Sequence, residues 1–245
     1  MATFLCLSST FFWTVFALLC SLCVNGDVCC ETARSPDSSG IIYDAYLNAG
    51  VIINNANFGE PYTLNSHGEL VFHAGTRQFG RLFRIPLSRP NRLSGRETLL
   101  VDVTYSNRSP ISPSTDMDPS FMLSDGVSAV GFLTRDKANF PSLSPIVPCD
   151  GTSGATVALT CSERDIRVTS DPATVHSLHF RLQPEQPASG SYSGSYDRGV
   201  SVYSNYTNLL YFERGLYFEV YRNDPNEQYI FSYFRIQVQS ESLAY

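Results

Sequence analysis

The sequence predicts an all-β fold, an antiparallel β-sandwich, on three observations. The clearest is the segment 209–238, in which two stretches alternate between apolar and polar side chains. About twelve short stretches rich in β-branched and aromatic residues follow one another at spacings of roughly 8–20 residues, each bounded by turn-forming residues. No long window shows the 3.6-residue periodicity of an amphipathic helix. Strands without intervening helices favour a sandwich over a parallel sheet.

The C-terminal segment gives the strongest strand prediction. The stretches 216–222 and 228–238 are separated by Asn223–Glu227, a cluster of turn-forming residues, and are interpreted as a β-hairpin with a five-residue loop. Every second side chain shares a face of a strand, which assigns two sets to the core: Leu216, Phe218 and Val220, then Ile230, Phe234, Ile236 and Val238. A hairpin this apolar needs a second sheet to cover it.

Earlier strands are predicted from the same alternation, in the order 41–47, 51–53, 70–73, 80–85, 98–105, 121–124, 127–133, 156–160, 166–169, 175–182 and 200–203. Asp125-Gly126 predicts a tight hairpin between two of them. The Pro- and Ser-rich segment 106–119 and the Ser/Gly/Tyr tract 188–199 are interpreted as loops, either tolerated insertions or binding surface. No internal repeat is present, so we expect a single sandwich domain over residues 41–240.

The N-terminus predicts export. An apolar run at Phe11–Leu19 is followed by small and polar residues up to Gly26, which is typical of a secretory signal peptide over residues 1–26. An uncleaved membrane anchor is the alternative, but the run is shorter than the roughly 20 residues of a membrane span. We expect a secreted, extracellular protein without a membrane span after signal removal, opening with a flexible lead at 27–40.

Charge argues against nucleic acid as a partner. The formal net charge is −6, and the 17 Lys and Arg residues form no run. A phosphate backbone is bound through clusters of basic side chains, and the sequence contains none.

Four cysteines follow the predicted signal: Cys29, Cys30, Cys149 and Cys161. An even count in an exported chain indicates disulfides. Cys149 and Cys161 enclose a turn and a strand-like run, so we predict that they pair. Cys29 and Cys30 could pair with each other, tether another chain, or reach the 149–161 loop.

Two N-x-S/T sequons predict a glycoprotein. Asn107-Arg-Ser and Asn205-Tyr-Thr both satisfy the rule that no proline stands at the middle position. We expect both asparagines to carry glycans and to lie in surface loops.

Catalytic motifs are weak. The nearest match to a serine nucleophile motif lies in the 188–199 tract and has the wrong spacing. A sandwich glycosidase would need two carboxylates across one scissile bond. That alternative requires two of Glu163, Asp165, Glu219 and Glu227 to face one cleft.

A segment rich in carboxylate side chains leaves open whether the protein binds calcium. Asp116, Asp118 and Asp125 lie within one stretch of loop and turn, and calcium prefers six to eight oxygen ligands from such irregular backbone. Asp and Asn are also the ordinary residues of turns. We therefore expect no cofactor, with a structural calcium as the alternative.

Tyrosines crowd the segment 192–211, among Ser, Gly and Asn. This composition is typical of adaptable recognition surfaces, and Tyr192 and Tyr196 are candidate ligand-binding residues. The alternative is a solvent-exposed linker whose tyrosines alternate on strand edges.

The segment Asp118–Phe132, with its D-G-x-x-x-x-G-F phrase, and the later segment Tyr217–Tyr229 resemble concanavalin-like, lectin-type jelly-roll sandwiches. The resemblance implies sugar binding, in some cases beside a structural calcium. It makes Asp125, Asn223 and Asp224 the candidate ligand-binding positions.

The predicted function is recognition without catalysis, of a glycan or of an extracellular protein partner. A secreted glycosidase-like enzyme is one alternative. A structural matrix component, dimerised through Cys29 or Cys30, is the other.

Overall fold

The computed structural model describes residues 41–46, 56–75, 79–87, 97–108, 118–134, 143–152, 158–162, 166–169, 175–197 and 201–240. They form β-strands, turns and a short 3-10 helix, η3 (Phe212–Arg214). Within these ranges no helix is long and apolar enough to cross a membrane. The predicted signal peptide 1–26, lead 27–40 and strand 51–53 lie outside the described residues.

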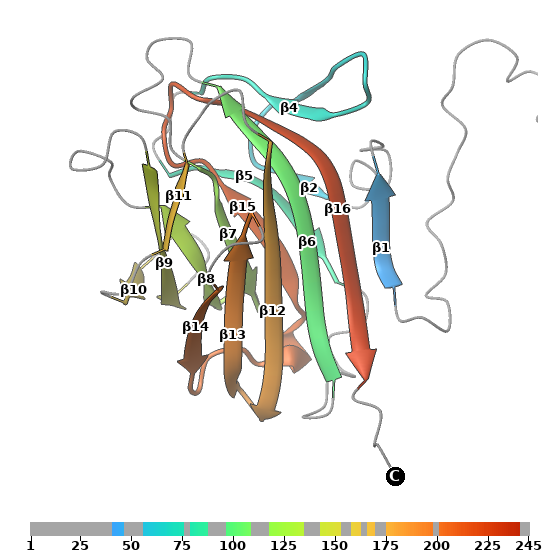
Figure 1. Cartoon of the computed structure of the whole chain (residues 1–245). Coiled ribbons are helices and arrows are strands. Elements are labelled where there is room, and N and C mark those ends of the chain that lie inside the picture. The colour runs from blue at the N-terminus through green and yellow to red at the C-terminus, as the bar shows by residue number, and fades with distance from the viewer. Residues whose placement is uncertain are drawn as a thin grey trace, which may run out of the picture. The chain divides into compact units, whose positions relative to one another are not determined.

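The described strands form two antiparallel sheets of eight strands each (Figure 1). Sheet A has the order β14-β13-β12-β6-β16-β4-β3, with β1 paired to β16; its strands are β1 (Ile41–Tyr46), β3 (Thr63–Leu64), β4 (Leu70–Phe72), β6 (Glu97–Arg108), β12 (His176–Gln186), β13 (Ser189–Tyr196), β14 (Ser201–Tyr206) and β16 (Gln228–Ser240).

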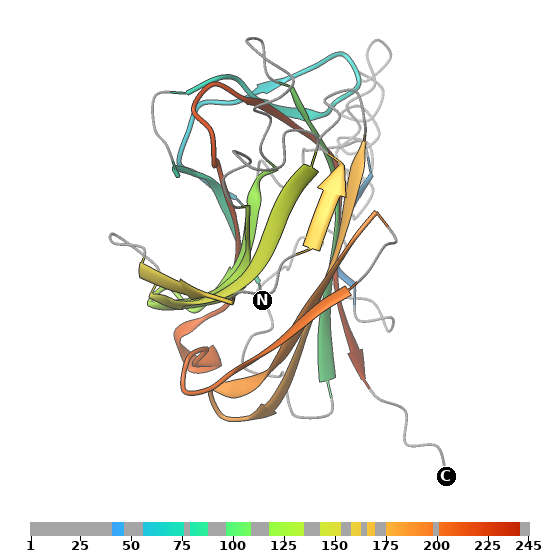
Figure 2. The ribbon, with the colours of Figure 1, turned by 60° about the vertical axis from the view of Figure 1, so that its left-hand side comes forward.

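Sheet B has the order β10-β9-β8-β7-β15-β5-β2, with β11 paired to β9; its strands are β2 (Asn57–Phe58), β5 (Arg81–Pro86), β7 (Ser120–Ser124), β8 (Ser128–Thr134), β9 (Leu143–Thr152), β10 (Ala158–Cys161), β11 (Ile166–Thr169) and β15 (Tyr217–Tyr221). The two layers are seen in Figure 2, with β8 and β9 in one and β12 and β13 in the other. The predicted antiparallel sandwich is confirmed.

Aromatic side chains join the two layers. Phe83 of sheet B meets Phe231 of sheet A with ring centroids 5.4 Å apart, and Phe132 meets Phe180 at 5.0 Å. Both contacts are edge-to-face, the arrangement that the charge distribution of aromatic rings favours. All four rings are buried in one hydrophobic cluster that takes residues from both sheets. The core of the sandwich therefore lies between the sheets, as the alternation predicts.

The predicted C-terminal hairpin is wrong. β15 pairs with β5 and β7 in sheet B, whereas β16 pairs with β6, β4 and β1 in sheet A. The connection 222–227 therefore crosses from one sheet to the other. Alternation shows which face of a strand is buried, but it does not show which strand lies beside it.

A β-bulge in β16 also corrects the predicted core face. The register to β6 shifts between Phe231 and Tyr233, so that Tyr229 and Phe231 face the core before the shift and Phe234 faces it afterwards. Ile230, predicted to share a face with Phe234, is only partly buried. An extra residue in one strand reverses the inside–outside alternation, and no residue type marks this bulge in the sequence.

Two local predictions are confirmed. β7 and β8 form the predicted hairpin around Asp125-Gly126, where Gly126 adopts φ 90°, a conformation that side-chain-bearing residues rarely take. Cys149 and Cys161 form a disulfide and stand opposite each other in neighbouring strands β9 and β10.

Candidate functional site

The tract predicted as a loop at 188–199 is mostly β13, and its repetitive sequence has a structural meaning. In Ser189-Gly-Ser-Tyr-Ser-Gly-Ser-Tyr196 every second residue is a serine, and the Gly and Tyr residues occupy the positions between them. Tyr192 and Tyr196 are buried in the core. Since successive side chains of a strand point to opposite faces, the serines face outward. The loop interpretation is wrong because the period-two pattern was taken for low complexity.

Both glycines of β13 are required by close packing. A Cβ on Gly194 would lie 2.7 Å from two carbons of the Phe132 ring. A Cβ on Gly190 would lie 2.3 Å from the Gln183 carbonyl oxygen and 2.9 Å from the Tyr206 hydroxyl. Real Cβ atoms do not approach other atoms so closely, so these positions accept no side chain without rearrangement. The strand is thereby held against the core, with its serines outward.

The neighbouring strands turn this serine row into a groove. Across β14, β13 and β12, the register places outward side chains in three rows: Asn205, Ser191 and Gln183; Tyr203, Ser193 and Arg181; Ser201, Ser195 and His179. Neighbouring strands lie about 4.8 Å apart, and successive rows about 6.6 Å apart. The short side chains of β13 thus form a floor, and the longer ones of β14 and β12 form two walls.

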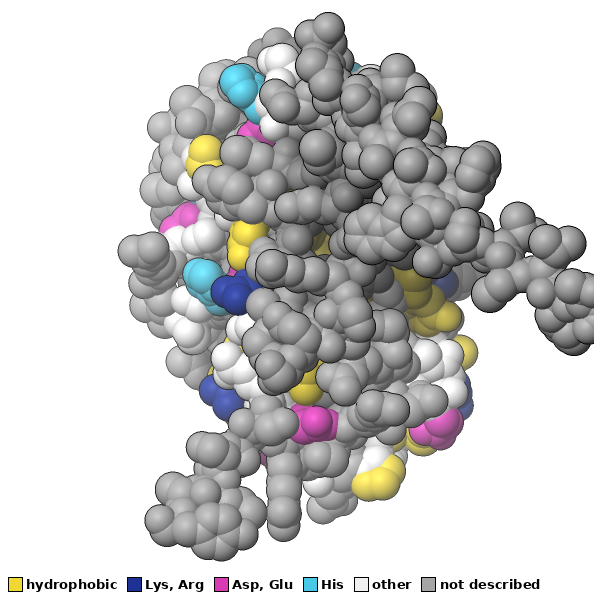
Figure 3. All heavy atoms as spheres, turned by 90° about the vertical axis from the view of Figure 1, so that its right-hand side faces the viewer, with side chains coloured by type: hydrophobic (Ala, Val, Ile, Leu, Met, Phe, Trp, Pro, Cys, Tyr) yellow, Lys and Arg dark blue, Asp and Glu magenta, His cyan; other side chains and the backbone are white. Residues whose placement is uncertain are grey.

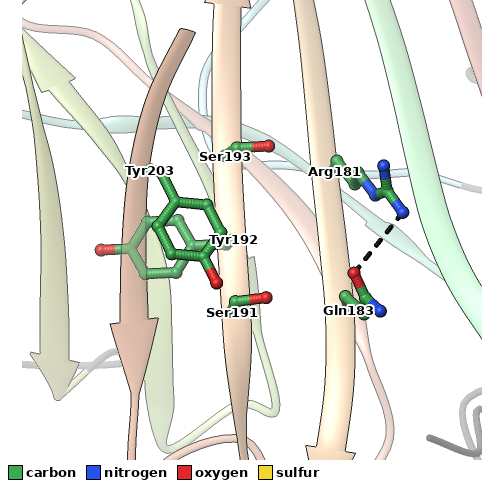
Figure 4. Close-up of a pocket in the computed structure, with 6 residues that line it drawn as sticks. All are labelled: Arg181, Gln183, Ser191, Tyr192, Ser193 and Tyr203. Carbon is green, nitrogen blue, oxygen red and sulfur yellow. Dashed lines mark hydrogen bonds between the residues drawn. The ribbon is translucent and has the colours of Figure 1, made fainter.

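The middle of this groove, which we call the β13 groove, is a hollow of about 140 Å³ lined by Arg181, Gln183, Ser191, Tyr192, Ser193 and Tyr203 (Figure 4). Tyr203 is 57% exposed. In Figure 4 its ring lies between β14 and β13, and the Arg181 and Gln183 side chains extend from the side of β12 that is turned away from the serines. An exposed aromatic ring with several hydrogen-bonding groups on neighbouring strands can hold a flat ligand with one apolar face and a polar edge.

The β12 wall supplies charge and directional donors. The Arg181 Nη2 group donates a hydrogen bond of 3.4 Å to Gln183 Oε1, which orients the two side chains alongside each other. No carboxylate among the described residues lies within ion-pair distance of Arg181. Below it on the same strand, His179 Nδ1 lies 2.6 Å from Asp102 Oδ1 of β6. The groove therefore offers a guanidinium whose donors remain available to a ligand.

The side chains of Tyr192 and Tyr196, the predicted ligand-binding tyrosines, pack in the core, although Tyr192 is also among the residues that line the hollow. Both are only 2% exposed, and the Tyr192 hydroxyl donates to the Cys149 carbonyl oxygen at 3.1 Å, which links the two sheets. Burial raises the pKa of both hydroxyls. They build the core, and the tyrosine of the same segment that faces solvent in the groove is Tyr203.

Asp125 is a structural clamp at the β7–β8 turn. Its Oδ1 accepts hydrogen bonds from the N–H groups of Val127 and Ser128, at 2.8 and 2.7 Å. Its Oδ2 accepts from the Tyr211 N–H at 3.0 Å and from the Arg214 guanidinium at 3.2 Å. The carboxylate is buried and engaged on both oxygens, so it ties this turn to the segment before η3 and does not face a ligand.

The predicted calcium ligands do not assemble into one site. Asp118 precedes β7 and Asp125 follows it, and seven residues of extended chain separate their Cα atoms by about 23 Å. Asp125 already accepts from an arginine, which calcium would have to displace. Asp116 lies outside the described residues. Within the described residues no three His, Cys, Asp or Glu side chains are grouped as a metal site. A single ion shared by Asp118 and Asp125 is excluded by this geometry.

Asn223 and Asp224 lie at the opposite end of β15 from Asp125. The Asn223 Nδ2 group donates to the Asp118 carbonyl oxygen at 2.5 Å, and its Oδ1 accepts from the Ser120 hydroxyl at 2.9 Å. Asp224 Oδ1 accepts from the Asn226 N–H at 2.8 Å within the same loop. These groups fix the connection between the two sheets. The five predicted ligand-binding residues are therefore not brought together.

The two sequons have different surroundings, and neither lies in the surface loop that the sequence predicts. Asn107 is in β6, fully buried, and its Nδ2 group donates to Glu227 Oε2 at 3.2 Å. Because this side chain is fully buried, a glycan on its nitrogen is incompatible with the packing around it. Asn205 is in β14 and exposed, at a corner of the β13 groove.

The carboxylates of the glycosidase alternative do not form an open pair among the described residues. Glu219 is fully buried; Arg84 holds its Oε1 at 2.5 Å and the Tyr221 hydroxyl donates to its Oε2 at 2.6 Å. Glu227 is fully buried too, beside Asn107. Glu163 and Asp165 lie outside the described residues.

On the face seen in Figure 3, the described side chains are a mixture of acidic, basic, histidine and hydrophobic groups, and no kind gathers there into an extended patch.

Comparison with known proteins gives a fold. No protein-family model and no curated protein matches the chain. An alginate lyase, Aly36B, is similar in structure with a TM-score of 0.50 and 11% sequence identity, over 82% of this chain and 98% of that chain. Peanut lectin has a TM-score of 0.45 and 10% identity over 86% and 96% of the two chains. The carbohydrate recognition domain of Emp46p has a TM-score of 0.48 and 12% identity over 78% and 91%.

The likeness is one of fold alone. The lyase match and the strand order of the two sheets agree with the lectin-type sandwich that the sequence predicts. At such identities the comparisons carry no residue from those proteins onto this chain, so the candidate site rests on the β13 groove itself.

Proposed function

We propose that this protein is a secreted, non-enzymatic recognition protein that binds glycans in the β13 groove. The observation that carries the proposal is the outward array of β14, β13 and β12, in which an exposed tyrosine, a row of serine hydroxyls, and a guanidinium with an amide follow one another across three neighbouring strands. Secretion rests on the predicted signal peptide.

The chemistry of the groove matches that of a sugar ring. A pyranose has an apolar C–H face and a rim of hydroxyls that both donate and accept. Tyr203 supplies an aromatic face for the first. Arg181 supplies several N–H donors, while Gln183 and the serine hydroxyls supply donors and acceptors for the second. Since these groups stand on three hydrogen-bonded strands, they are held in place before the ligand binds.

Solved structures of similar fold include sugar complexes, which supports the class of ligand. One is an alginate lyase in complex with an alginate tetrasaccharide, at a TM-score of 0.50 and 11% identity. An extracellular protein partner is the competing ligand. The hollow of about 140 Å³ favours a compact ligand, because protein partners bind mainly over larger areas.

A glycan-array screen of the purified mature protein tests the proposal, followed by titration of the best ligand against Tyr203→Ala. We expect Tyr203→Ala to weaken binding about tenfold, which corresponds to about 1.4 kcal/mol. The matched control is Leu64→Ala, which removes a side chain of 49% exposure from β3, at the other edge of sheet A. It should bind as the parent does.

Chelation of divalent cations should leave binding unchanged, because Asp118 and Asp125 lie outside the groove and apart from each other. Loss of binding on chelation would contradict the assignment of the ligand to the β13 groove. No binding to any glycan would refute the function and favour a protein partner.

A further inference from the structure

Asn205 lies where a covalent change would reach the candidate site. It stands opposite Ser191, a floor residue of the β13 groove, in the β13–β14 register. It is two residues from Tyr203 on the same outward face, and both are exposed. Across the strands its Cα lies about 5 Å from that of Ser191, and along the strand about 6.6 Å from that of Tyr203. Anything attached to its amide nitrogen therefore starts at the rim of the hollow.

The sequon around Asn205 also suits modification in the folded protein. Tyr206, the middle residue, points inward and is 3% exposed, whereas Asn205 and Thr207 are exposed. β14 is the terminal strand of sheet A in its pairing order. A sugar on Asn205 projects from the sheet into solvent without disturbing the core. Asn107 provides the contrast, since its amide nitrogen is buried against Glu227.

We propose that Asn205 carries an N-linked glycan that lies along the β13 groove and competes with external glycans, so that glycosylation regulates the site. This inference rests on the proposed function. In the reaction, the Asn205 amide nitrogen bonds to the anomeric carbon of a glycan supplied by a lipid-linked diphosphate donor. The anomeric C–O bond breaks, its electron pair leaves with the diphosphate, and the amide loses one proton.

The weakening of external glycan binding can be estimated by treating the attached glycan as an intramolecular competitor. A ligand tethered by a short flexible link has an effective concentration on the order of millimolar. If the attached glycan binds the groove with a dissociation constant of roughly 0.1–1 mM, it occupies the groove for half of the time or more. External binding is then weakened about two- to tenfold.

The test uses the full chain secreted from a eukaryotic host, in three forms. One carries the intact glycan; one is trimmed with an endoglycosidase to a single sugar; the third is Thr207→Ala, which abolishes the sequon and leaves every groove residue in place. Mass spectrometry of the peptide around Asn205 establishes occupancy. Titration with the best glycan from the array should give the tightest binding for Thr207→Ala and binding two- to tenfold weaker for the intact form.

Ser109→Ala is the matched control, because it removes the other sequon and should leave affinity unchanged. The inference is overturned if Asn205 is unmodified in the secreted protein. It is also overturned if all forms bind equally, and in that case the proposed function stands. A change in self-association without a change in affinity would mean that the glycan only shields the edge of the sheet. If Thr207→Ala binds no glycan at all, both the inference and the proposed function fail.

Discussion

Gly194→Ala tests whether the packing under the groove is as tight as the structure shows. The new Cβ would meet two Phe132 ring carbons at 2.7 Å and a third at 3.1 Å. Phe132 has little room to move, because Phe180 and Tyr192 pack against it with centroids at 5.0 and 5.6 Å. Overpacking of this kind costs about 1–3 kcal/mol, and the lower backbone entropy of alanine offsets about 0.5–1 kcal/mol of it. We expect a net loss of roughly 0.5–2 kcal/mol.

Thermal denaturation of the matched variants measures this loss. In a domain of this size about 1 kcal/mol shifts Tm by about 2–4 °C, so Gly194→Ala should melt roughly 1–8 °C below the parent. Ser193→Ala, the adjacent outward position, should stay within about 0.5 kcal/mol of the parent. Combining Gly194→Ala with Phe132→Leu should cost less than the sum of the two single changes, because leucine makes room for the methyl group. A Gly194→Ala protein as stable as the parent would refute the inward packing of β13.

Two further predictions concern stability. Asp125→Ala should cost about 2–4 kcal/mol in chemical denaturation, because it leaves backbone N–H groups at the β7–β8 turn without an acceptor. Asp224→Ala should cost less than about 1 kcal/mol, because its side chain accepts from the N–H of Asn226, an exposed residue. Equal costs would contradict the role of Asp125 as a clamp. Burial raises the pKa of Tyr105, Tyr192, Tyr196, Tyr206 and Tyr229 above the ordinary value. These hydroxyls ionise more readily in the unfolded chain, so their contribution to stability is complete below pH about 10 and falls as the pH rises further. Phenolate absorbance from them and loss of the β circular dichroism signal should therefore appear together, and ionisation of all tyrosines before unfolding would refute their burial.

Alternation in the sequence predicted correctly which side chains of β15, and of β16 after its bulge, face the core. Phe218 and Val220 are fully buried, and so is Ile236, as their parity requires. This works because a strand that is buried on one face must alternate between apolar and polar side chains. The turn chemistry of Asp125-Gly126 was equally informative, since the φ of 90° at Gly126 favours glycine.

Strand partners and the bulge could not be predicted in the same way. The segment Asn223–Glu227 contains the residue types of a hairpin turn, yet it connects a strand of sheet B to a strand of sheet A. The partners of these two strands, β5 and β6 among them, come from distant parts of the chain, so the turn residues do not determine the pairing. The bulge between Phe231 and Tyr233 arises from the register to β6, a strand more than a hundred residues earlier in the chain. Such long-range relations leave no local pattern.

The candidate site was missed because its signal resembles that of a linker. Serine and glycine together suggest flexible chain, but the strict period of two in Ser189–Tyr196 distinguishes a strand from a linker. Reading that period would have placed the serines on one face and Tyr192 on the other. The sequence does not show that Arg181 and Tyr203 lie on the strands on either side of β13, because this depends on how the strands pair. The groove could therefore be recognised only in the structure.

The two faces of β13 have different roles: the inward residues stabilise the fold, and the outward residues belong to the proposed binding site. The residues of the inward face are constrained, because Gly194 packs against Phe132 and the Tyr192 hydroxyl donates to the Cys149 carbonyl oxygen of the other sheet. On the outward face Ser193 and Ser195 are partly exposed, and substitutions at the surface usually change stability by less than about 0.5 kcal/mol. For the proposed function, a change of ligand can therefore arise at Ser193 or at the walls without loss of the fold. This independence follows from the alternation of a single strand, and under the proposed function it assigns binding specificity to the outward positions.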